Sequence, residues 1–137
     1  MKVNTYVNFP GNCAEAFRYY ERHLGARVGM MMTHAQAPGG EVSPDWKDAV
    51  LHGRIAIGDA ELWAADIPKA EPMRSAYLTL RLESDLEAER IFSVLSDAGR
   101  VLMPIEETFF AFRFGQVQDR FGVNWMILHD RPLPPQP

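Results

Sequence analysis

The chain has 137 residues, with 47% hydrophobic and 23% charged residues, which is the composition of one globular domain with a core of its own. A net charge of −4 without any cluster of lysine and arginine argues against a nucleic-acid partner. The single cysteine, Cys13, excludes an internal disulfide, and the sequence has neither a signal peptide nor an apolar run of membrane-spanning length. We therefore expect a cytoplasmic protein that does not bind membranes.

The first half of the sequence predicts a strand, a helix and three further strands. Residues 2–9 resemble a strand, and a helix is expected over residues 12–24. Asn12 and Glu15 have the spacing of a capping box, and Gly25 is suited to end the helix. The apolar stripe of this helix comprises Cys13, Phe17, Tyr20 and Leu24. The next predicted elements are a strand over 27–33, a loop over 35–47, and a hairpin of strands over 49–57 and 60–65, turning at Gly58-Asp59.

After a proline-containing linker over residues 66–74, the second half repeats this order. Ser84 and Glu87 form another capping box, and Gly99 is expected to end the helix that they begin. Asp119 is typical of a turn in the following hairpin. The predicted elements are strands over 75–83 and 100–103, a helix over 84–98, and a hairpin over 109–128 whose turn spans 116–122.

The repeated order predicts an α+β fold built from two βαβββ modules. The modules are expected over residues 1–66 and 75–129, within a single domain of residues 1–129. Residues 130–137 are rich in proline and are expected to form a flexible tail. In each module one sheet face is covered by a helix, so the other faces are expected to form a curved sheet around a cavity.

Three segments resemble the PhnB-like branch of the vicinal oxygen chelate superfamily, which includes glyoxalase I, bleomycin-resistance proteins and extradiol dioxygenases. These segments are NFPGNCAEAFRYYERHLGA, ELWAAD and EETFFAFRFGQVQDRFGVNWMI. The resemblance covers roughly residues 3–129 and implies the glyoxalase-like fold and a homodimer. It implies no reaction, because this branch has no agreed activity.

The resemblance also implies where metal ligands would stand, near Thr5, Asp66, Tyr77 and Met126. Octahedral divalent metals prefer several nitrogen and oxygen donors, and only Asp66 supplies a carboxylate among these positions. We therefore expect no metal ion and no other cofactor. The sequence also lacks a GxGxxG motif after a strand, which argues against a Rossmann-type methyltransferase.

Several side chains are candidates for a ligand site in the expected cavity. His52 lies within a predicted strand and is a candidate catalytic acid–base group, or else a half-buried histidine with hydrogen-bonded neighbours. Arg81 could clamp an anion with help from Tyr77 and Thr79, because alternation places these three opposite the strand's leucines; a solvated face or a dimer contact is the alternative. An apolar ligand wall, or simply core, is formed by Trp63, Phe110, Phe112, Phe114 and Met126.

Together these features favour a metal-free protein that binds an unidentified small molecule in the sheet cavity and assembles as a homodimer. One alternative is a glyoxalase- or dioxygenase-type enzyme with lyase or isomerase chemistry, using unusual metal ligands or acid–base catalysis by His52. A structural dimer without any ligand is the third possibility.

Overall fold

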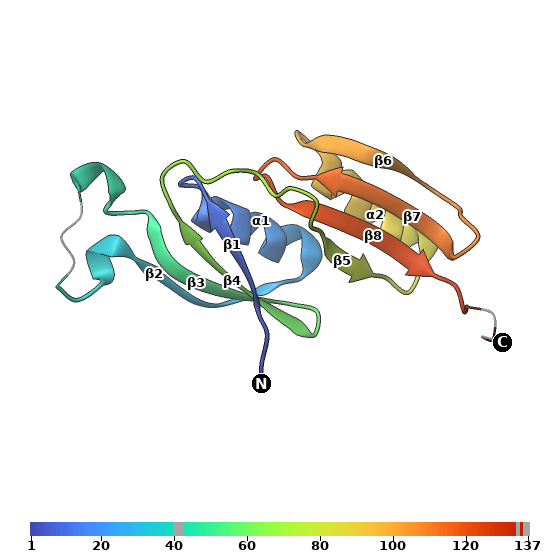
Figure 1. Cartoon of the computed structure of the whole chain (residues 1–137), viewed down its shortest axis with the longest axis horizontal. Coiled ribbons are helices and arrows are strands. Elements are labelled where there is room, and N and C mark those ends of the chain that lie inside the picture. Colours follow the sequence, from blue (N-terminus) through green and yellow to red (C-terminus); the bar gives the residue numbers. More distant parts are fainter. Residues whose placement is uncertain (40–42, 134, 136–137) are drawn as a thin grey trace. The chain divides into compact units, whose positions relative to one another are not determined.

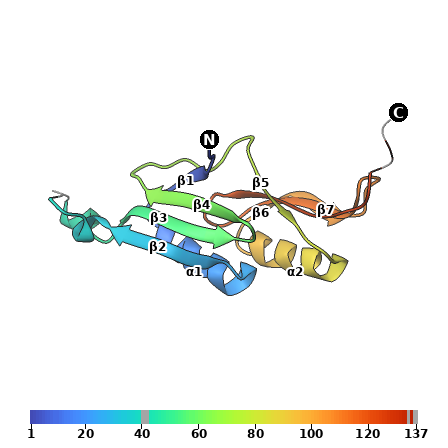
Figure 2. The same ribbon diagram turned by 90° about the horizontal axis from the view of Figure 1, so that it is seen from below.

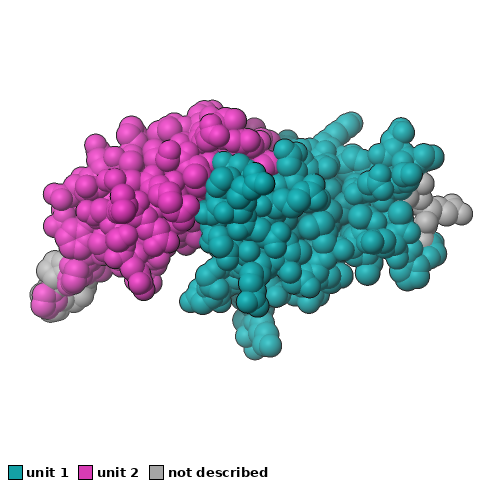
Figure 3. Space-filling view, turned by 180° about the vertical axis from the view of Figure 1, so that it is seen from behind, with its two compact units in different colours: residues 1–71 teal, residues 72–137 magenta. Residues whose placement is uncertain are grey.

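The computed structural model describes residues 1–39, 43–133 and 135. The chain forms two compact units, Met1–Glu71 and Pro72–Pro137, which Figure 3 colours separately. Each unit contains a four-stranded mixed sheet and one α-helix of 12 residues, which confirms the predicted α+β fold of two βαβββ modules. Within the described residues, neither helix is long and apolar enough to cross a membrane.

The first unit pairs its strands in the order β1-β4-β3-β2, with β1 parallel to β4 and the other pairs antiparallel (Figure 1). Two short 3-10 turns lie in the predicted loop, of which residues 40–42 are outside the described residues. The elements are β1 Thr5–Phe9, α1 Cys13–Leu24, β2 Arg27–Thr33, η1 His34–Gln36, η2 Pro44–Trp46, β3 Val50–Ile57 and β4 Ala60–Asp66.

Helix α1 covers one face of this sheet, where its apolar stripe is buried (Figure 2). Cys13, Phe17 and Tyr20 are fully buried, as the predicted stripe requires. Gly53 in β3 admits the Phe17 ring, because a Cβ at this position would lie 3.0 Å from Phe17 Cε2. Gly25 ends the helix in the left-handed conformation with φ of 66°, which confirms its predicted role.

Asn12 occupies the N-cap position of α1 as predicted, but the side chain that caps the helix is distant in sequence, so the predicted capping box is wrong. The Asn12 side chain makes no capping hydrogen bond, and its Oδ1 is buried without a partner. Asp66 Oδ1, at the end of β4, instead accepts hydrogen bonds from the backbone N–H groups of Gly11 and Cys13, each at 3.0 Å. Asp66 Oδ2 accepts another from Val50 N at 2.8 Å. A buried carboxylate therefore joins the helix to two strands of its sheet.

The second unit repeats the arrangement, with strand order β5-β8-β7-β6 and β5 parallel to β8 (Figure 1). Its elements are β5 Leu78–Arg81, α2 Asp85–Ser96, β6 Arg100–Glu106, β7 Ala111–Gln118 and β8 Asn124–Asp130. Strand β8 reaches into the predicted tail of residues 130–137, of which residues 134, 136 and 137 lie outside the described residues.

Strand β5 is shorter than the predicted strand over residues 75–83, because the preceding segment is held by a side chain rather than by a strand ladder. Asn124 Nδ2 donates to the carbonyl oxygens of Met73 and Ala76, each at 3.1 Å. Ser75, between these residues, has a φ of 51°, which is incompatible with an extended strand. Within β5, Leu78 pairs with the buried Trp125.

The two ends of α2 differ in how far they follow the prediction. Ser84 Oγ accepts a hydrogen bond from Glu87 N at 3.1 Å, which confirms Ser84 as the N-cap. At the other end, Ala98 rather than Gly99 adopts the left-handed conformation, with φ of 57°. Gly99 is required for a different reason, since a Cβ there would overlap the backbone carbonyl oxygen of Gln118. Helix α2 ends at Ser96, so the predicted helix over residues 84–98 is two residues too long at this end, and the prediction that Gly99 ends it is wrong.

The β7–β8 hairpin is stabilised at its turn by Asp119, as its predicted role in the turn requires. Asp119 Oδ1 accepts hydrogen bonds from the backbone N–H groups of Phe121 and Val123, each at 2.9 Å. Its Oδ2 accepts from Trp125 Nε1 at 2.8 Å. The carboxylate thus fixes both the turn and the largest buried side chain of the second unit.

Candidate functional site

The sheet face of the first unit that points away from α1, here called the distal face, carries a group of polar and aromatic side chains. Val7, Ile55 and Leu62 are buried on the α1 side, so their neighbours in β1, β3 and β4 point to the distal face. The strand register places Trp63 beside both Tyr6 and Arg54. The distal-face cluster, as we define it, consists of Tyr6, His52, Arg54, Glu61 and Trp63.

Trp63 holds the guanidinium of Arg54 in a defined position. The Cζ atom of Arg54 lies 3.9 Å from the centroid of the Trp63 ring, which is a close cation–π contact. Arg54 Nε also donates a hydrogen bond to His52 Nε2 at 3.0 Å. Trp63 is itself oriented, because its Nε1 donates to Glu61 Oε1 at 2.6 Å.

The contacts of His52 determine which of its nitrogens carries the ring proton. An arginine Nε can only donate, so His52 Nε2 is the acceptor and the ring proton is on Nδ1. His52 Nδ1 lies 3.3 Å from the Tyr6 hydroxyl oxygen, so Nδ1–H donates to Tyr6. The His52 ring also lies against Tyr6, with centroids 5.9 Å apart, and meets Trp63 edge-on at 5.3 Å.

The structure therefore brings together two candidates from the sequence, His52 and Trp63, and adds three that sequence reasoning missed. Arg54 could have been found, because it lies two residues after His52 and alternation places both on one face. Glu61 has the same spacing from Trp63. Tyr6 could not be placed with them without the register of β1 against β4.

In the second unit, the predicted alternation of β5 is confirmed by its pairing with β8. Leu80 pairs with the buried Ile127, while Thr79 and Arg81 pair with Met126 and Leu128 and share with them the face away from α2. Arg81 is highly exposed and its Nη2 forms an ion pair with Asp130 Oδ2 at 3.0 Å. This hydrogen bond from Arg81 lowers the pKa of the Asp130 carboxyl below its ordinary value.

Tyr77 and the phenylalanines of the predicted wall are arranged less regularly than alternation predicts. Tyr77 precedes β5, whereas Phe110 and Phe114 contact each other edge-to-face, with ring centroids 5.0 Å apart. Phe112 does not join them, because β7 has an irregularity in its register between Ala111 and Arg113. Its ring instead lies 4.9 Å from the His129 ring.

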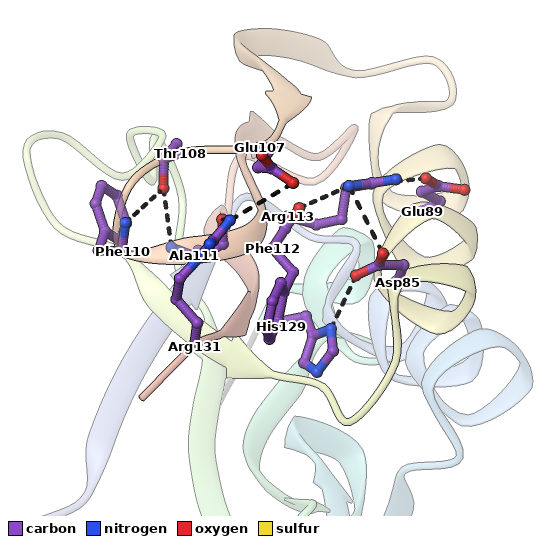
Figure 4. Close-up of polar contacts among 10 residues, drawn as sticks. All are labelled: Asp85, Glu89, Glu107, Thr108, Phe110, Ala111, Phe112, Arg113, His129 and Arg131. Atoms are coloured by element: carbon purple, nitrogen blue, oxygen red, sulfur yellow. Dashed lines mark hydrogen bonds and ion pairs between the residues drawn. The ribbon is translucent and has the colours of Figure 1, made fainter. Parts of the chain in front are cut away.

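A second polar network, not anticipated from the sequence, connects the start of α2 to β7 and β8 (Figure 4). His129 Nδ1 lies 2.9 Å from Asp85 Oδ1, and Arg113 Nη1 is 3.6 Å from Asp85 Oδ2. Arg113 Nε donates to Glu89 Oε1 at 2.8 Å, and this bond raises the pKa of Arg113 above its ordinary value. The network joins helix to sheet and is a structural counterpart of the Asp66 cap in the first unit.

The residues at the metal positions implied by the resemblance do not fit a divalent ion. Both carboxylate oxygens of Asp66 accept hydrogen bonds from backbone N–H groups at the start of α1 and of β3. Thr5, Tyr77 and Met126 do not supply the further carboxylate or imidazole donors that such an ion needs. Among the residues described by the structure, no three His, Cys, Asp or Glu side chains gather to hold a metal.

Comparison with known proteins identifies relatives over nearly the whole chain. A family model described as 3-demethylubiquinone-9 3-methyltransferase matches residues 1–128. Protein YjdN of Escherichia coli (strain K12) is 36% identical in an alignment of 141 positions that covers 93% of this chain and 94% of YjdN. The crystal structure of protein PA1353 from Pseudomonas aeruginosa shares 38% identity with a TM-score of 0.85, covering 96% of this chain and 99% of PA1353.

More distant structures share the fold alone. A Bacillus cereus protein described as a putative 3-demethylubiquinone-9 3-methyltransferase, PhnB protein, has 21% identity and a TM-score of 0.78, covering 94% of this chain and 99% of that one. A glyoxylase/bleomycin resistance protein/dioxygenase domain from Frankia has 12% identity and a TM-score of 0.64, covering 96% and 93% of the two chains.

Proposed function

Because this chain belongs to the 3-demethylubiquinone-9 3-methyltransferase family, the PhnB-like branch of the vicinal oxygen chelate superfamily, we propose that it binds a small organic molecule on the distal face of its first sheet. The binding is proposed to use side chains alone, without a metal ion or other cofactor.

The observation that supports this proposal is the distal-face cluster. Small-molecule sites combine aromatic surface with a few oriented polar groups. Here Trp63 and Tyr6 supply aromatic surface. His52 contacts both of these rings and accepts a hydrogen bond from Arg54, whose guanidinium lies over the Trp63 ring. Tyr6 is 49% exposed, so this residue is accessible to a ligand.

The ligand contacts predicted in the second unit stay predictions. They comprise Tyr77, Thr79, Arg81, Phe110, Phe112, Phe114 and Met126. Of these, Arg81 already has an acidic partner in Asp130, so an anionic ligand would have to compete with that ion pair. The cluster of the first unit is therefore the better supported site.

Binding is favoured over acid–base catalysis by the contacts of His52. Both of its ring nitrogens already have hydrogen-bonding partners, so taking a proton on Nε2 would break the bond from Arg54 and place two donors against each other. Methyl transfer, which the family description names, is not proposed. The described part of the chain forms two βαβββ units, each with a mixed sheet. Rossmann-type methyltransferases instead bind S-adenosylmethionine on a doubly wound parallel sheet.

A ligand screen with matched variants tests this proposal. The full chain is screened against a library of small organic acids, amides and phenols, with hits ranked by thermal shift and verified by equilibrium dialysis. Trp63→Ala should abolish binding of the hits, whereas Phe109→Ala, which removes another exposed aromatic ring, should leave it unchanged. Hits that bind Trp63→Ala as well as the original chain, or a library without hits, would contradict the proposal.

A further inference from the structure

We infer that the distal-face cluster selects ligands that carry an oxyanion at one end and a second hydrogen-bond acceptor at the other. In this arrangement Arg54 binds a carboxylate, phosphate or phosphonate, and the Tyr6 hydroxyl donates to the second acceptor. This inference rests on the proposed function, because it concerns the same site and names the class of its ligand.

In the described part of the chain, the terminal nitrogens Nη1 and Nη2 of the Arg54 guanidinium form no hydrogen bond or ion pair. Its Nε is used by His52 and its flat face by Trp63, which leaves the two terminal amino groups at the edge of the guanidinium. Across the described part of the chain, no carboxylate forms an ion pair with Arg54. Glu61, the acidic member of the cluster, instead accepts from Trp63 Nε1. An arginine held in one orientation with free terminal donors is suited to a planar or tetrahedral oxyanion.

The hydroxyl proton of Tyr6 is directed to an acceptor other than His52. Since His52 Nε2 accepts from Arg54, Nδ1–H donates to the Tyr6 oxygen, and the hydroxyl's own hydrogen must point elsewhere. The order of donation is thus Arg54 to His52 to Tyr6, and such chains strengthen each successive donor. The ligand supplies the acceptor at the end of this chain.

The positions of the two donors determine the shape of the ligand. Tyr6 and Arg54 bond to different nitrogens of one imidazole, so they stand at opposite sides of the His52 ring. This arrangement favours a short molecule with acceptors at its two ends over one small ion such as phosphate. His52 is accordingly a positioning residue, which sets the direction of both donors without being the group that holds the oxyanion.

Matched probes separate these contacts. 4-Acetylbenzoate carries a carboxylate and a carbonyl acceptor, 4-acetylbenzamide lacks the charge, and benzoate lacks the second acceptor. Phenylphosphonate and its neutral dimethyl ester form a second pair for the oxyanion. We expect 4-acetylbenzoate to bind at least about tenfold more tightly than 4-acetylbenzamide, as a charge-assisted hydrogen bond implies.

Variants assign each preference to a residue. Arg54→Gln should remove the preference for 4-acetylbenzoate over 4-acetylbenzamide. Tyr6→Phe should remove the preference for 4-acetylbenzoate over benzoate. Arg18→Gln and Tyr19→Phe make the same chemical changes on α1 and should leave both preferences intact. His52→Leu should reduce both preferences. His52→Gln keeps a donor and an acceptor and should partly restore them. If His52 were merely structural, its replacement would weaken the binding of all probes equally.

The outcomes distinguish this inference from the function on which it rests. If neutral probes bind as tightly as the two oxyanions and Trp63→Ala abolishes this binding, the inference is overturned. Small-molecule binding on the distal face would then remain in place. Oxyanion preference that survives Arg54→Gln would also overturn it. No binding of any probe, together with a library that yields no hits, would overturn both.

Discussion

Replacement of Asp66 by asparagine tests how the first unit is held together. The carboxylate accepts hydrogen bonds from the backbone N–H groups of Gly11, Cys13 and Val50, at 2.8 to 3.0 Å. In Asp66→Asn, the remaining carbonyl oxygen can still accept from Gly11 and Cys13. The new amide nitrogen would then face Val50 N, and two donors cannot bond to each other.

The expected cost follows from these contacts. Losing one charge-assisted hydrogen bond costs about 1.5–3 kcal/mol, and leaving a buried N–H without a partner costs about 1–3 kcal/mol. We therefore expect Asp66→Asn to lower the free energy of unfolding by roughly 2.5–6 kcal/mol, the sum of these two costs. This is a large part of the roughly 5–15 kcal/mol that stabilises an ordinary domain.

Urea denaturation followed by circular dichroism measures this loss. Glu15→Gln makes the same change from carboxylate to amide in the first turn of α1, at an exposed position, and should change stability by less than about 1 kcal/mol. Asn12→Ala should be nearly neutral, because the Asn12 side chain makes no capping bond. A loss at Asp66→Asn no larger than at Glu15→Gln, or a large loss at Asn12→Ala, would refute Asp66 as the cap.

Three further predictions concern the thiol, the end of α2 and the assembly. Burial first, and then the charge of Asp66, raise the pKa of the Cys13 thiol from 9.0 to about 12. As the pH rises, the Cys13 thiol therefore ionises in the unfolded state before it ionises in the folded state. Its contribution to the free energy of unfolding is fully present below pH 9 and falls by at most about 1.4 kcal/mol per pH unit toward pH 12. Urea titrations at alkaline pH should show a weaker fall in Cys13→Ala. Ala98→Gly should raise the unfolding free energy by about 1 kcal/mol in a urea titration, because φ is positive there, whereas Gly99→Ala should lower it, and the opposite order would contradict this account. Light scattering at micromolar concentration should give the mass of a homodimer, and a monomer would refute the proposed assembly.

The elements of the fold could be predicted because their signals are local. Cys13, Phe17 and Tyr20 recur at helical spacing, and Gly25 follows directly, so one short segment contains the whole pattern of α1. The Ser84 cap was found for the same reason. The cap of α1 could not be found in this way, because Asp66 reaches it from the far end of β4 and Asn12 offered a plausible local substitute.

The candidate site was only partly predictable, since it depends on strand pairing. His52 and Trp63 were recognised by residue type, and alternation alone would have added Arg54. Tyr6 joins them only through the register of β1 against β4, which no local pattern contains. In the second unit, alternation placed Phe112 with Phe114, and the irregularity in β7 separates them.

The indole N–H signals of the three tryptophans give the most direct test of ligand binding on the distal face. In a ¹H–¹⁵N correlation spectrum of the full chain titrated with 4-acetylbenzoate, Trp63 should shift, because its Nε1 and ring belong to the distal-face cluster. Trp125, buried against Asp119, and Trp46, in η2, should not shift, and the response of Trp63 should disappear in Arg54→Gln. Shifts of Trp125 or Trp46 without Trp63, or a Trp63 response unchanged by Arg54→Gln, would contradict the account.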